Sequence, residues 1–349
     1  MENKGYFREM TGEQRRIFLD AAQLYQAYLE LTAKRSAYRG GMHWKKVKER
    51  EYLFRSRDRL GYGKSLGPRS PKTESIYTEF HENKTQLQEN LRELRERLKE
   101  QSRFCKAARI ARVPRIVGSI LRVLGTQKLL GSSLQVVGTN SLYAYEAAAG
   151  VFFNSGLMAT QDMDILWDVR ARLQLQANQK MDGKGLLFIL QQADPSFALI
   201  RQRSFRAVNR KGYMVDLLKP EPRPPHLMEK RRMGPNGDME AAEIRNLQWL
   251  ASAPKFTHEV IGDDGYPAAM VTPDPRAFAL HKLWLSGQAD REPIKRRRDR
   301  DQSIAVLRLV LQHLPHLGFQ PGELKIFPKS VVSAAAAAMA DVDLPPGYR

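Results

Sequence analysis

The chain has 349 residues, with 57 Lys and Arg against 38 Asp and Glu, giving a formal net charge of +19 and a pI near 10. That length allows two domains, the charge favours a polyanion such as nucleic acid as partner, and the single Cys105 excludes an intramolecular disulfide. The start of the chain lacks the apolar core of a signal peptide and no stretch is apolar for the length of a membrane span, so we expect a soluble, cytoplasmic protein with no membrane partner.

Residues 1–35 have apolar positions at helical spacing and are predicted to be helical. Residues 31–70 then hold 12 Lys or Arg against 3 Asp or Glu, interleaved with aromatic residues such as Trp44 and Tyr52. Cations for phosphate and rings for stacking are typical of a nucleic-acid surface. A solvated loop packed on its own domain is an equally good interpretation. The candidate nucleic-acid-binding residues here are Lys45, Lys46, Lys64 and Arg69.

A long helix is predicted from Thr73 to about Arg109, because leucines from Leu87 to Leu98 step by threes and fours between charged faces. This coiled-coil-like seam could dimerise the protein or pack against the first helix, and packing within the chain is favoured because the seam spans few heptads. We assign residues 1–112 to a basic, helical N-terminal region.

The rest of the chain predicts an α+β fold, with a mixed-sheet core over residues 113–272 and a C-terminal helical region over residues 273–349 that closes the cleft. The spacing of apolar, glycine and proline residues gives its elements. In chain order they are a helix after Pro114, a strand at 134–137, a helix at 144–149, a strand at 162–167, a helix at 185–192, antiparallel strands at 197–201, 204–209 and 213–218, a hairpin of 256–261 with 266–271, and helices at 275–286, 301–313 and 332–340.

Two short segments carry the chemistry. The strand at 134–137 ends in Gly138, Thr139, Asn140 and Ser141, a turn whose backbone N–H groups and following helix suit phosphate. On the second strand Asp162 and Asp164 point to the same face, because strand side chains alternate. Two neighbouring carboxylates repel unless a cation lies between them, and Mg²⁺ prefers oxygen ligands. Together the segments predict metal-dependent chemistry on a nucleoside triphosphate.

The order of strand, glycine-hydroxyl turn, helix and Asp-x-Asp strand resembles the DNA polymerase β-like nucleotidyltransferase superfamily. That superfamily often adds a third carboxylate on a later strand, and Asp216 is the candidate, although an edge aspartate in a salt bridge is the alternative. The turn begins Gly-Thr instead of Gly-Ser or Gly-Gly, and its distance from Asp162 is long, which looks closer to the AbiEii-like minimal nucleotidyltransferases and to uncharacterised bacterial proteins of this fold. By that resemblance Lys282 binds triphosphate and Asp299 supports the site. The alternatives are an exposed helix cation for Lys282 and an N-cap or intrahelical ion pair for Asp299.

The resemblance implies transfer of a nucleoside monophosphate from an NTP to an acceptor hydroxyl, with two Mg²⁺ or Mn²⁺ ions held by Asp162, Asp164 and Asp216. RNA is the expected acceptor, the 3′ end of tRNA being plausible, and it would be gripped by the N-terminal region and by Arg296, Arg297 and Arg298. A toxin or defence role with an antitoxin protein partner is compatible with the resemblance. The alternatives are an AMPylation-type transferase acting on a protein hydroxyl, and an inactive nucleic-acid-binding protein.

Overall fold

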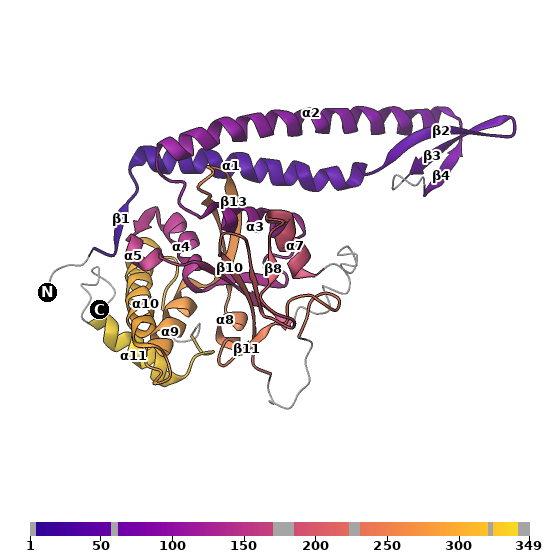
Figure 1. Cartoon of the computed structure of the whole chain (residues 1–349). Helices are drawn as coiled ribbons and strands as arrows, with labels where there is room; N and C mark the ends of the chain where they lie inside the picture. Colours follow the sequence, from indigo (N-terminus) through magenta and orange to yellow (C-terminus); the bar gives the residue numbers. More distant parts are fainter. Residues whose placement is uncertain (1–4, 57–61, 170–184, 223–230, 320–323, 341–349) are drawn as a thin grey trace. The chain divides into compact units, whose positions relative to one another are not determined.

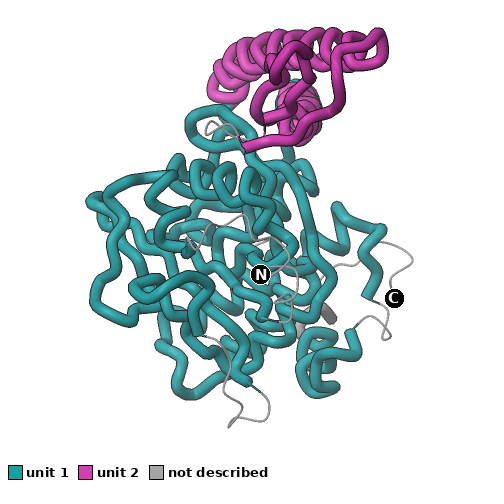
Figure 2. Tube along the Cα trace, turned by 90° about the vertical axis from the view of Figure 1, so that its right-hand side faces the viewer, with its two compact units in different colours: residues 1–15, 109–349 teal, residues 16–108 magenta. Residues whose placement is uncertain are grey.

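The computed structural model describes residues 5–56, 62–169, 185–222, 231–319 and 324–340. The chain divides into two compact units, one made of residues 1–15 and 109–349 and the other of residues 16–108, which Figure 2 shows in different colours. The fold is α+β, as predicted. Where the structure describes the chain, it contains no helix with the length and apolar character needed to cross a bilayer.

The smaller unit is built on the helices α1 (Gly12–Arg35) and α2 (Pro71–Ala107). They run side by side in Figure 1, and the side-chain amide of Gln101 on α2 donates a 2.9 Å hydrogen bond to the Ile17 carbonyl of α1. The long helix and its packing against the first helix are therefore as predicted. Ser70 caps α2, its hydroxyl accepting from the Thr73 N–H while the Thr73 hydroxyl accepts from the Ser70 N–H.

Residues 41–56 and 63–68 form a three-stranded antiparallel sheet, so the interpretation of this segment as a loop is wrong. Its strands, in the order β2-β3-β4, are β2 (Gly41–Val47), β3 (Arg50–Ser56) and β4 (Gly63–Pro68). Met42 and Leu53 are buried with Phe80 of α2, while His43 and Lys45 face outward. This alternation of apolar and polar residues is the strand signal in the sequence, and the density of basic residues obscured it.

The larger unit is centred on a six-stranded sheet, in which β10 lies between β7 and β9. β10 is parallel to β7 and antiparallel to β9, and β5 is antiparallel to β7. The strands, in the order β5-β7-β10-β9-β8 with β11 also paired to β10, are β5 (Leu134–Val137), β7 (Asp162–Trp167), β10 (Met214–Pro220), β9 (Arg206–Val208), β8 (Ala198–Leu199) and β11 (Ala242–Ile244).

The two faces of this sheet bury different cores. Met163 and Val215 belong to the main core, which also contains apolar residues of α3 (Arg115–Thr126) and α7 (Leu186–Ala193). Leu166, on the opposite face, belongs to a second core with residues of three C-terminal helices. These are α8 (Gln248–Ser252), α9 (Pro275–Ser286) and α11 (Lys329–Ala340). Asp162 and Asp164 alternate with Met163, so they share the face that looks toward the second core.

The remaining elements confirm the hairpin of β12 (Lys255–Ile261) with β13 (Pro267–Pro273) and add a strand pair that the sequence analysis missed, β1 (Phe7–Glu9) with β6 (Val151–Phe153). The last long helix begins at Pro293 and not at Asp301, because proline at the first helical position is compatible with a helix start. That long helix is α10 (Pro293–His313). The other helices are short: η1 (Ser36–Tyr38), η2 (Gly138–Asn140), α4 (Ser141–Ala149) and α5 (Ser155–Met158).

Candidate active site

Three carboxylates lie on one face of the central sheet. Asp164 on β7 is directly opposite Asp216 on the parallel strand β10, and Asp162 is opposite Met214, two residues earlier on the same strands. The twofold periodicity of strands puts all three aspartates on the same side. The pairing of β7 with β10, over a sequence separation of about fifty residues, thus places the Asp-x-Asp pair beside the third carboxylate named from the sequence.

The glycine turn is fitted against this cluster. Val137 is opposite Asp164 in the pairing of β5 with β7, and Gly138 follows it with φ of +70°. A Cβ at residue 138 would collide with the Asp164 carboxylate oxygen Oδ2. Glycine is therefore required here both for the left-handed backbone and for space.

The side chains after Gly138 are buried and hold the turn in place. The Ser141 hydroxyl donates to the Val136 carbonyl at 3.2 Å, and the Asn140 amide donates to the Asp162 carbonyl at 2.7 Å. The Thr139 hydroxyl accepts a 3.2 Å hydrogen bond from the amide of Gln302 on α10. These three hydrogen bonds tie the side chains of the turn to the surrounding fold.

Lys282 enters the site from α9 and is held by Asp299 of α10. The Lys282 ammonium lies 2.7 Å from Asp299 Oδ1, while Arg291 donates to the other oxygen at 2.9 Å. Both Lys282 and Asp299 are buried. Burial alone would raise the pKa of Asp299, but the Lys282 ammonium and Arg291 outweigh it and the pKa is lowered. The structure thus brings together the two residues that the sequence placed in separate segments.

Arg206 is a site residue that the sequence analysis missed. It lies on β9 opposite Asp216, and its Nε and Nη2 each donate a 2.6 Å hydrogen bond to one oxygen of that carboxylate. Such a bidentate pair is a strong charge-assisted interaction. Asp216 is therefore in a salt bridge, as in the alternative that the sequence left open, but it lies on an inner strand of the sheet and not at an edge. The two strands had to be paired before Arg206 could be found.

The electrostatics of the cluster suit a divalent cation. The pKa of Asp164 is raised to about 7, first by burial and then by the negative charges of Asp162 and Asp216. A cation with oxygen ligands would relieve this repulsion, and the Asp162 and Asp164 carboxylates are the hard donors that Mg²⁺ takes. Within the described ranges no group of three or more His, Cys, Asp or Glu side chains is already arranged around a metal position.

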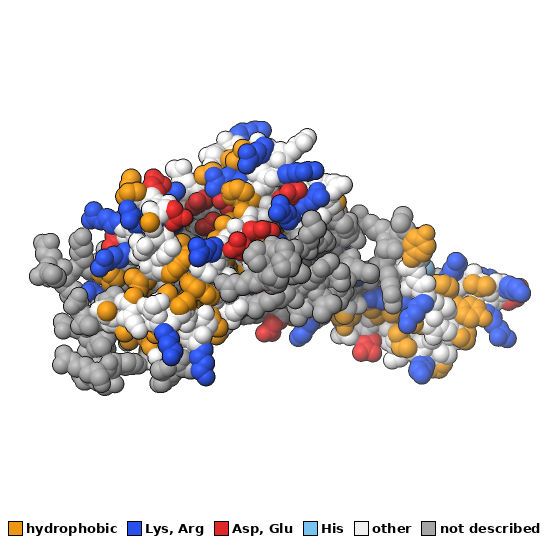
Figure 3. Space-filling model, turned by 90° about the horizontal axis from the view of Figure 1, so that it is seen from below, with side chains coloured by type: hydrophobic (Ala, Val, Ile, Leu, Met, Phe, Trp, Pro, Cys, Tyr) orange, Lys and Arg blue, Asp and Glu red, His pale blue; other side chains and the backbone are white. Residues whose placement is uncertain are grey.

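The basic candidates differ in their surroundings. Lys45, Lys46 and Lys64 are exposed, whereas Arg69 pairs with Glu51 at 2.6 Å and with Glu74 at 2.8 Å, so Arg69 has a structural function in the smaller unit. The remaining three, on α10, are exposed or half-buried; they are Arg296, Arg297 and Arg298. On the face drawn in Figure 3, Lys and Arg side chains are interspersed with Asp and Glu rather than gathered in one field.

Comparison with known proteins identifies the family. No curated protein and no solved structure matches the chain. Residues 115–323, which include the three aspartates, the glycine turn, Lys282 and Asp299, match the family described as Nucleotidyltransferase. This is more than half of the 349 residues. The chain therefore belongs to this nucleotidyltransferase family and is a transferase enzyme whose substrate is a nucleoside triphosphate.

Proposed function

We propose that the protein transfers a nucleoside monophosphate from an NTP to an acceptor hydroxyl in a metal-dependent reaction, as in the DNA polymerase β-like superfamily and its AbiEii-like branch. One observation carries this proposal: Asp164 and Asp216 lie opposite each other on neighbouring strands, with the Lys282 ammonium close enough to oppose the rise in the pKa of Asp164 that burial and the other two aspartates cause. A negative cluster beside a buried cation suits a substrate that brings both a metal ion and phosphates.

Asp162, Asp164 and Asp216 are the residues that would hold Mg²⁺ or Mn²⁺. When bound, two such ions lower the pKa of the acceptor hydroxyl and stabilise charge on the transferred and leaving phosphates. Asp216 is bound to Arg206 through both oxygens, and each oxygen keeps a second lone pair with which it could bind a metal ion. Arg206 would then remain beside the metal ions, where its positive charge opposes theirs.

The triphosphate would lie between the glycine turn and α9. Backbone N–H groups of residues 139 and 140 stand in the first turn, η2, where the helix dipole favours negative charge, whereas the Ser141 N–H is donated to the Gly138 carbonyl. Lys282 supplies an ammonium group; burial lowers the pKa of Lys282, the charge of Asp299 opposes this, and Asp299 with Arg291 fixes its position. The C-terminal region, residues 273–349, thus contributes the cation that closes the site.

RNA is the acceptor class that the smaller unit favours. Tyr52 and Phe54 lie on the central strand, two residues apart, and both are on the face of the β2-β3-β4 sheet turned away from α2. Lys45 lies 5.3 Å from the Phe54 ring centroid, and His43 stacks on that ring at 6.3 Å. Half-buried aromatic rings among exposed cations are the features with which proteins stack and neutralise single strands.

The test is incubation of the protein with each α-³²P-labelled NTP, Mg²⁺ or Mn²⁺, and total bacterial RNA, with the Asp162→Ala/Asp164→Ala protein as control. Label on RNA that is lost in the double variant supports the proposal and names the nucleotide and acceptor, including the 3′ end of tRNA. Label on protein indicates AMPylation instead. RNA binding without transfer of any nucleotide contradicts the proposal. A toxin role is tested separately, by co-expressing this protein with the product of a neighbouring gene.

A further inference from the structure

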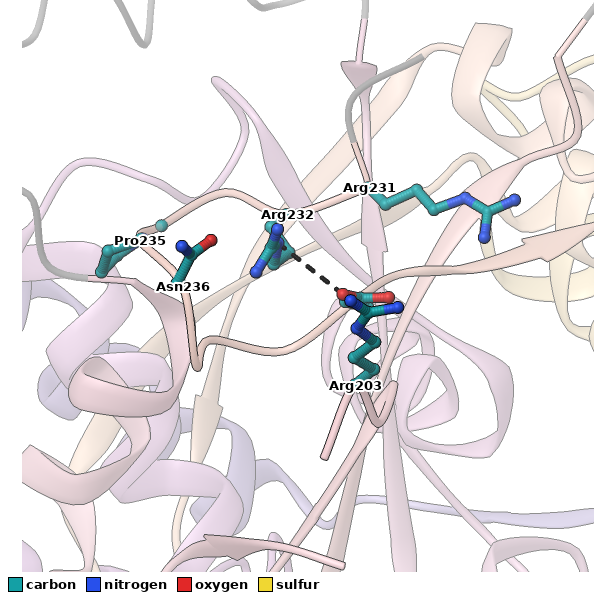
Figure 4. Close-up of a pocket in the computed structure, with 7 residues that line it drawn as sticks. Arg203, Arg231, Arg232, Pro235 and Asn236 are labelled. Atoms are coloured by element: carbon teal, nitrogen blue, oxygen red, sulfur yellow. Dashed lines mark ion pairs between the residues drawn. The ribbon is translucent and has the colours of Figure 1, made fainter. Parts of the chain in front are cut away.

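A groove lined by three arginines opens on the edge of the central sheet. Its volume is about 530 Å³, and a smaller hollow of about 210 Å³ adjoins it through Arg203, Arg231 and Glu240. Figure 4 shows that the arginines come from two segments, Arg203 from the turn before β9 and the others from the segment before β11. The groove is lined by Arg203, Arg231, Arg232, Pro235, Asn236 and Glu240.

The groove follows from the way β10 is paired. β9 covers the first half of one edge of β10, opposite residues 214–216, and β11 covers the second half, opposite residues 218–220. At the change from one strand to the other, the Glu240 N–H donates to the Ser204 carbonyl at 3.0 Å. The edge therefore has a gap between strands that side chains line but do not fill, and the arginines surround it.

Positive charge exceeds negative charge around this groove. Arg232 is paired with Glu240 at 3.7 Å, and Arg231 with Glu243 at the same distance, beyond ordinary hydrogen-bond length. Glu243 is also 3.2 Å from the buried Lys219 ammonium. No carboxylate partner of Arg203 is found among the described residues. The backbone of Arg203 has φ of +57°, which is unusual for a residue with a side chain.

The groove is close to the catalytic carboxylates along β9. Arg203 and Arg206 are three residues apart, a separation of at most about 11 Å even in an extended chain. Arg206 donates to both oxygens of Asp216. Phe205, between them, lines the smaller hollow. A continuous series of side chains thus connects the arginines with the site of transfer.

We propose that Arg203, Arg231 and Arg232 bind phosphodiester groups of the acceptor nucleic acid, a short distance before the hydroxyl that receives the nucleotide. The planar guanidinium fork matches two phosphate oxygens at once. An open groove at a sheet edge admits a strand that continues at both ends, whereas the triphosphate is accounted for by Lys282 and the glycine turn. That the bound nucleic acid is the acceptor of the nucleotide rests on the proposed function. That nucleic acid binds in the groove does not.

The experiment compares the full-length wild-type chain with the Arg203→Ala/Arg231→Ala variant in binding a fluorescent single-stranded RNA at several salt concentrations. The matched control is Arg201→Ala/Arg210→Ala, which removes the same charge from exposed positions outside the groove. We expect the groove variant to bind RNA at least about tenfold more weakly. Its slope of log affinity against log salt should fall by about 1.4, or 0.7 for each lost phosphate contact.

A second measurement separates the two phosphate sources. The affinity for a fluorescent NTP analogue should be the same in the groove variant and the wild type. Weaker NTP binding by the groove variant, with unchanged RNA binding, would assign the groove to the triphosphate and overturn the proposal. A slope of log RNA affinity against log salt equal to that of the control variant would also overturn it. If no RNA is labelled in the transfer assay but the groove variant still loses RNA affinity and slope, the proposed function fails while the groove proposal holds.

Discussion

The Arg206 guanidinium binds both carboxylate oxygens of Asp216, with two hydrogen bonds of 2.6 Å, directly beside Asp164 on the next strand. The protein itself therefore supplies a cation to one of the three carboxylates on this face. A metal ion bound by these aspartates, as proposed above, would meet the positive charge of Arg206 at Asp216. On that proposal Arg206, as well as the aspartates, would set the strength of metal binding.

Replacement of Arg206 by Ala should strengthen metal binding. The variant frees Asp216 and removes a positive charge from the cluster, and both changes favour a divalent cation. We expect the dissociation constant for Mn²⁺, measured by electron paramagnetic resonance without substrate, to fall several-fold. Asp216→Asn should raise it at least about tenfold. Arg210→Ala, on the exposed turn after β9, is the charge-matched control. Weaker Mn²⁺ binding in Arg206→Ala would show that Arg206 positions Asp216 for the metal and does not compete with it.

Replacement of Gly138 by Ala should damage the site more than the fold. The left-handed backbone costs an alanine about 1–2 kcal/mol, and its Cβ would push Asp164 away from its position. Since displacement of a catalytic group by about 1 Å can cost 100-fold, we expect transfer to fall on that order while the protein still unfolds cooperatively. Gly156→Ala is the control, because a Cβ at residue 156 meets no atom within 4 Å. Transfer at the wild-type rate in Gly138→Ala would refute the close approach of the turn to Asp164.

The pair of Lys282 with Asp299 allows stability to be separated from catalysis. Removing one partner of a buried ion pair costs about 3–5 kcal/mol, whereas replacing both by apolar residues is often nearly neutral. We expect Asp299→Leu to lower the free energy of unfolding by that amount, and Lys282→Met/Asp299→Leu to recover most of it in urea denaturation. Transfer should be lost in both, because the ammonium is absent from the double variant and misplaced in the single one. Recovery of transfer in the double variant would exclude Lys282 from the triphosphate site.

The exposed pair of Lys295 with Glu292, 3.0 Å apart, is the control for these substitutions. Its loss in Lys295→Ala should change the stability by less than about 1 kcal/mol.

The local features of the site could be predicted from the sequence because each is short in range. The strand of Asp162 and Asp164, the glycine at 138 and the helix of Lys282 all show in windows of a few residues, since strand and helix periods are local properties. Register is different. That Asp216 lies opposite Asp164, and Arg206 opposite Asp216, depends on which strands pair, a long-range choice made by burial of the two sheet faces.

The same distinction explains what was missed. Gln302 binds Thr139 across 163 positions of sequence, and nothing near either residue indicates the contact. The β2-β3-β4 sheet had a local signal, the alternation around Met42 and Trp44, but strands were not predicted there because the segment is dominated by charge. The start of α10 at Pro293 was also available from local rules, because the basic residues that follow it are compatible with a helix.

Protonation of His281 should destabilise the protein in acid. Burial, and then the Lys282 ammonium, lowers the pKa of His281 to about 3, against 6.5 in the unfolded chain. The unfolded chain thus binds more protons between these values, so the stability present above pH 6.5 is lost as the pH falls toward 3. At pH 5 the loss is about 2 kcal/mol. The His281→Phe variant, which keeps a ring against Trp249 and Trp284, should have a flatter stability curve between pH 7 and 5 in urea denaturation. The same curve in wild type and variant would contradict this assignment; replacement of the exposed His316 by Phe is the control.

The outer face of the β2-β3-β4 sheet can be tested by a change that removes rings and leaves charge intact. Replacement of both Tyr52 and Phe54 by Ser removes two stacking surfaces, each worth about 1–3 kcal/mol per base. We expect single-stranded RNA affinity to fall at least about tenfold while the slope against log salt stays unchanged, because no phosphate contact is lost. Phe104→Ser, at a half-exposed ring of α2 outside the sheet, is the control. A reduced slope, or an affinity equal to that of the control, would show that this face does not stack bases, and the cations of the larger unit would then account for RNA binding.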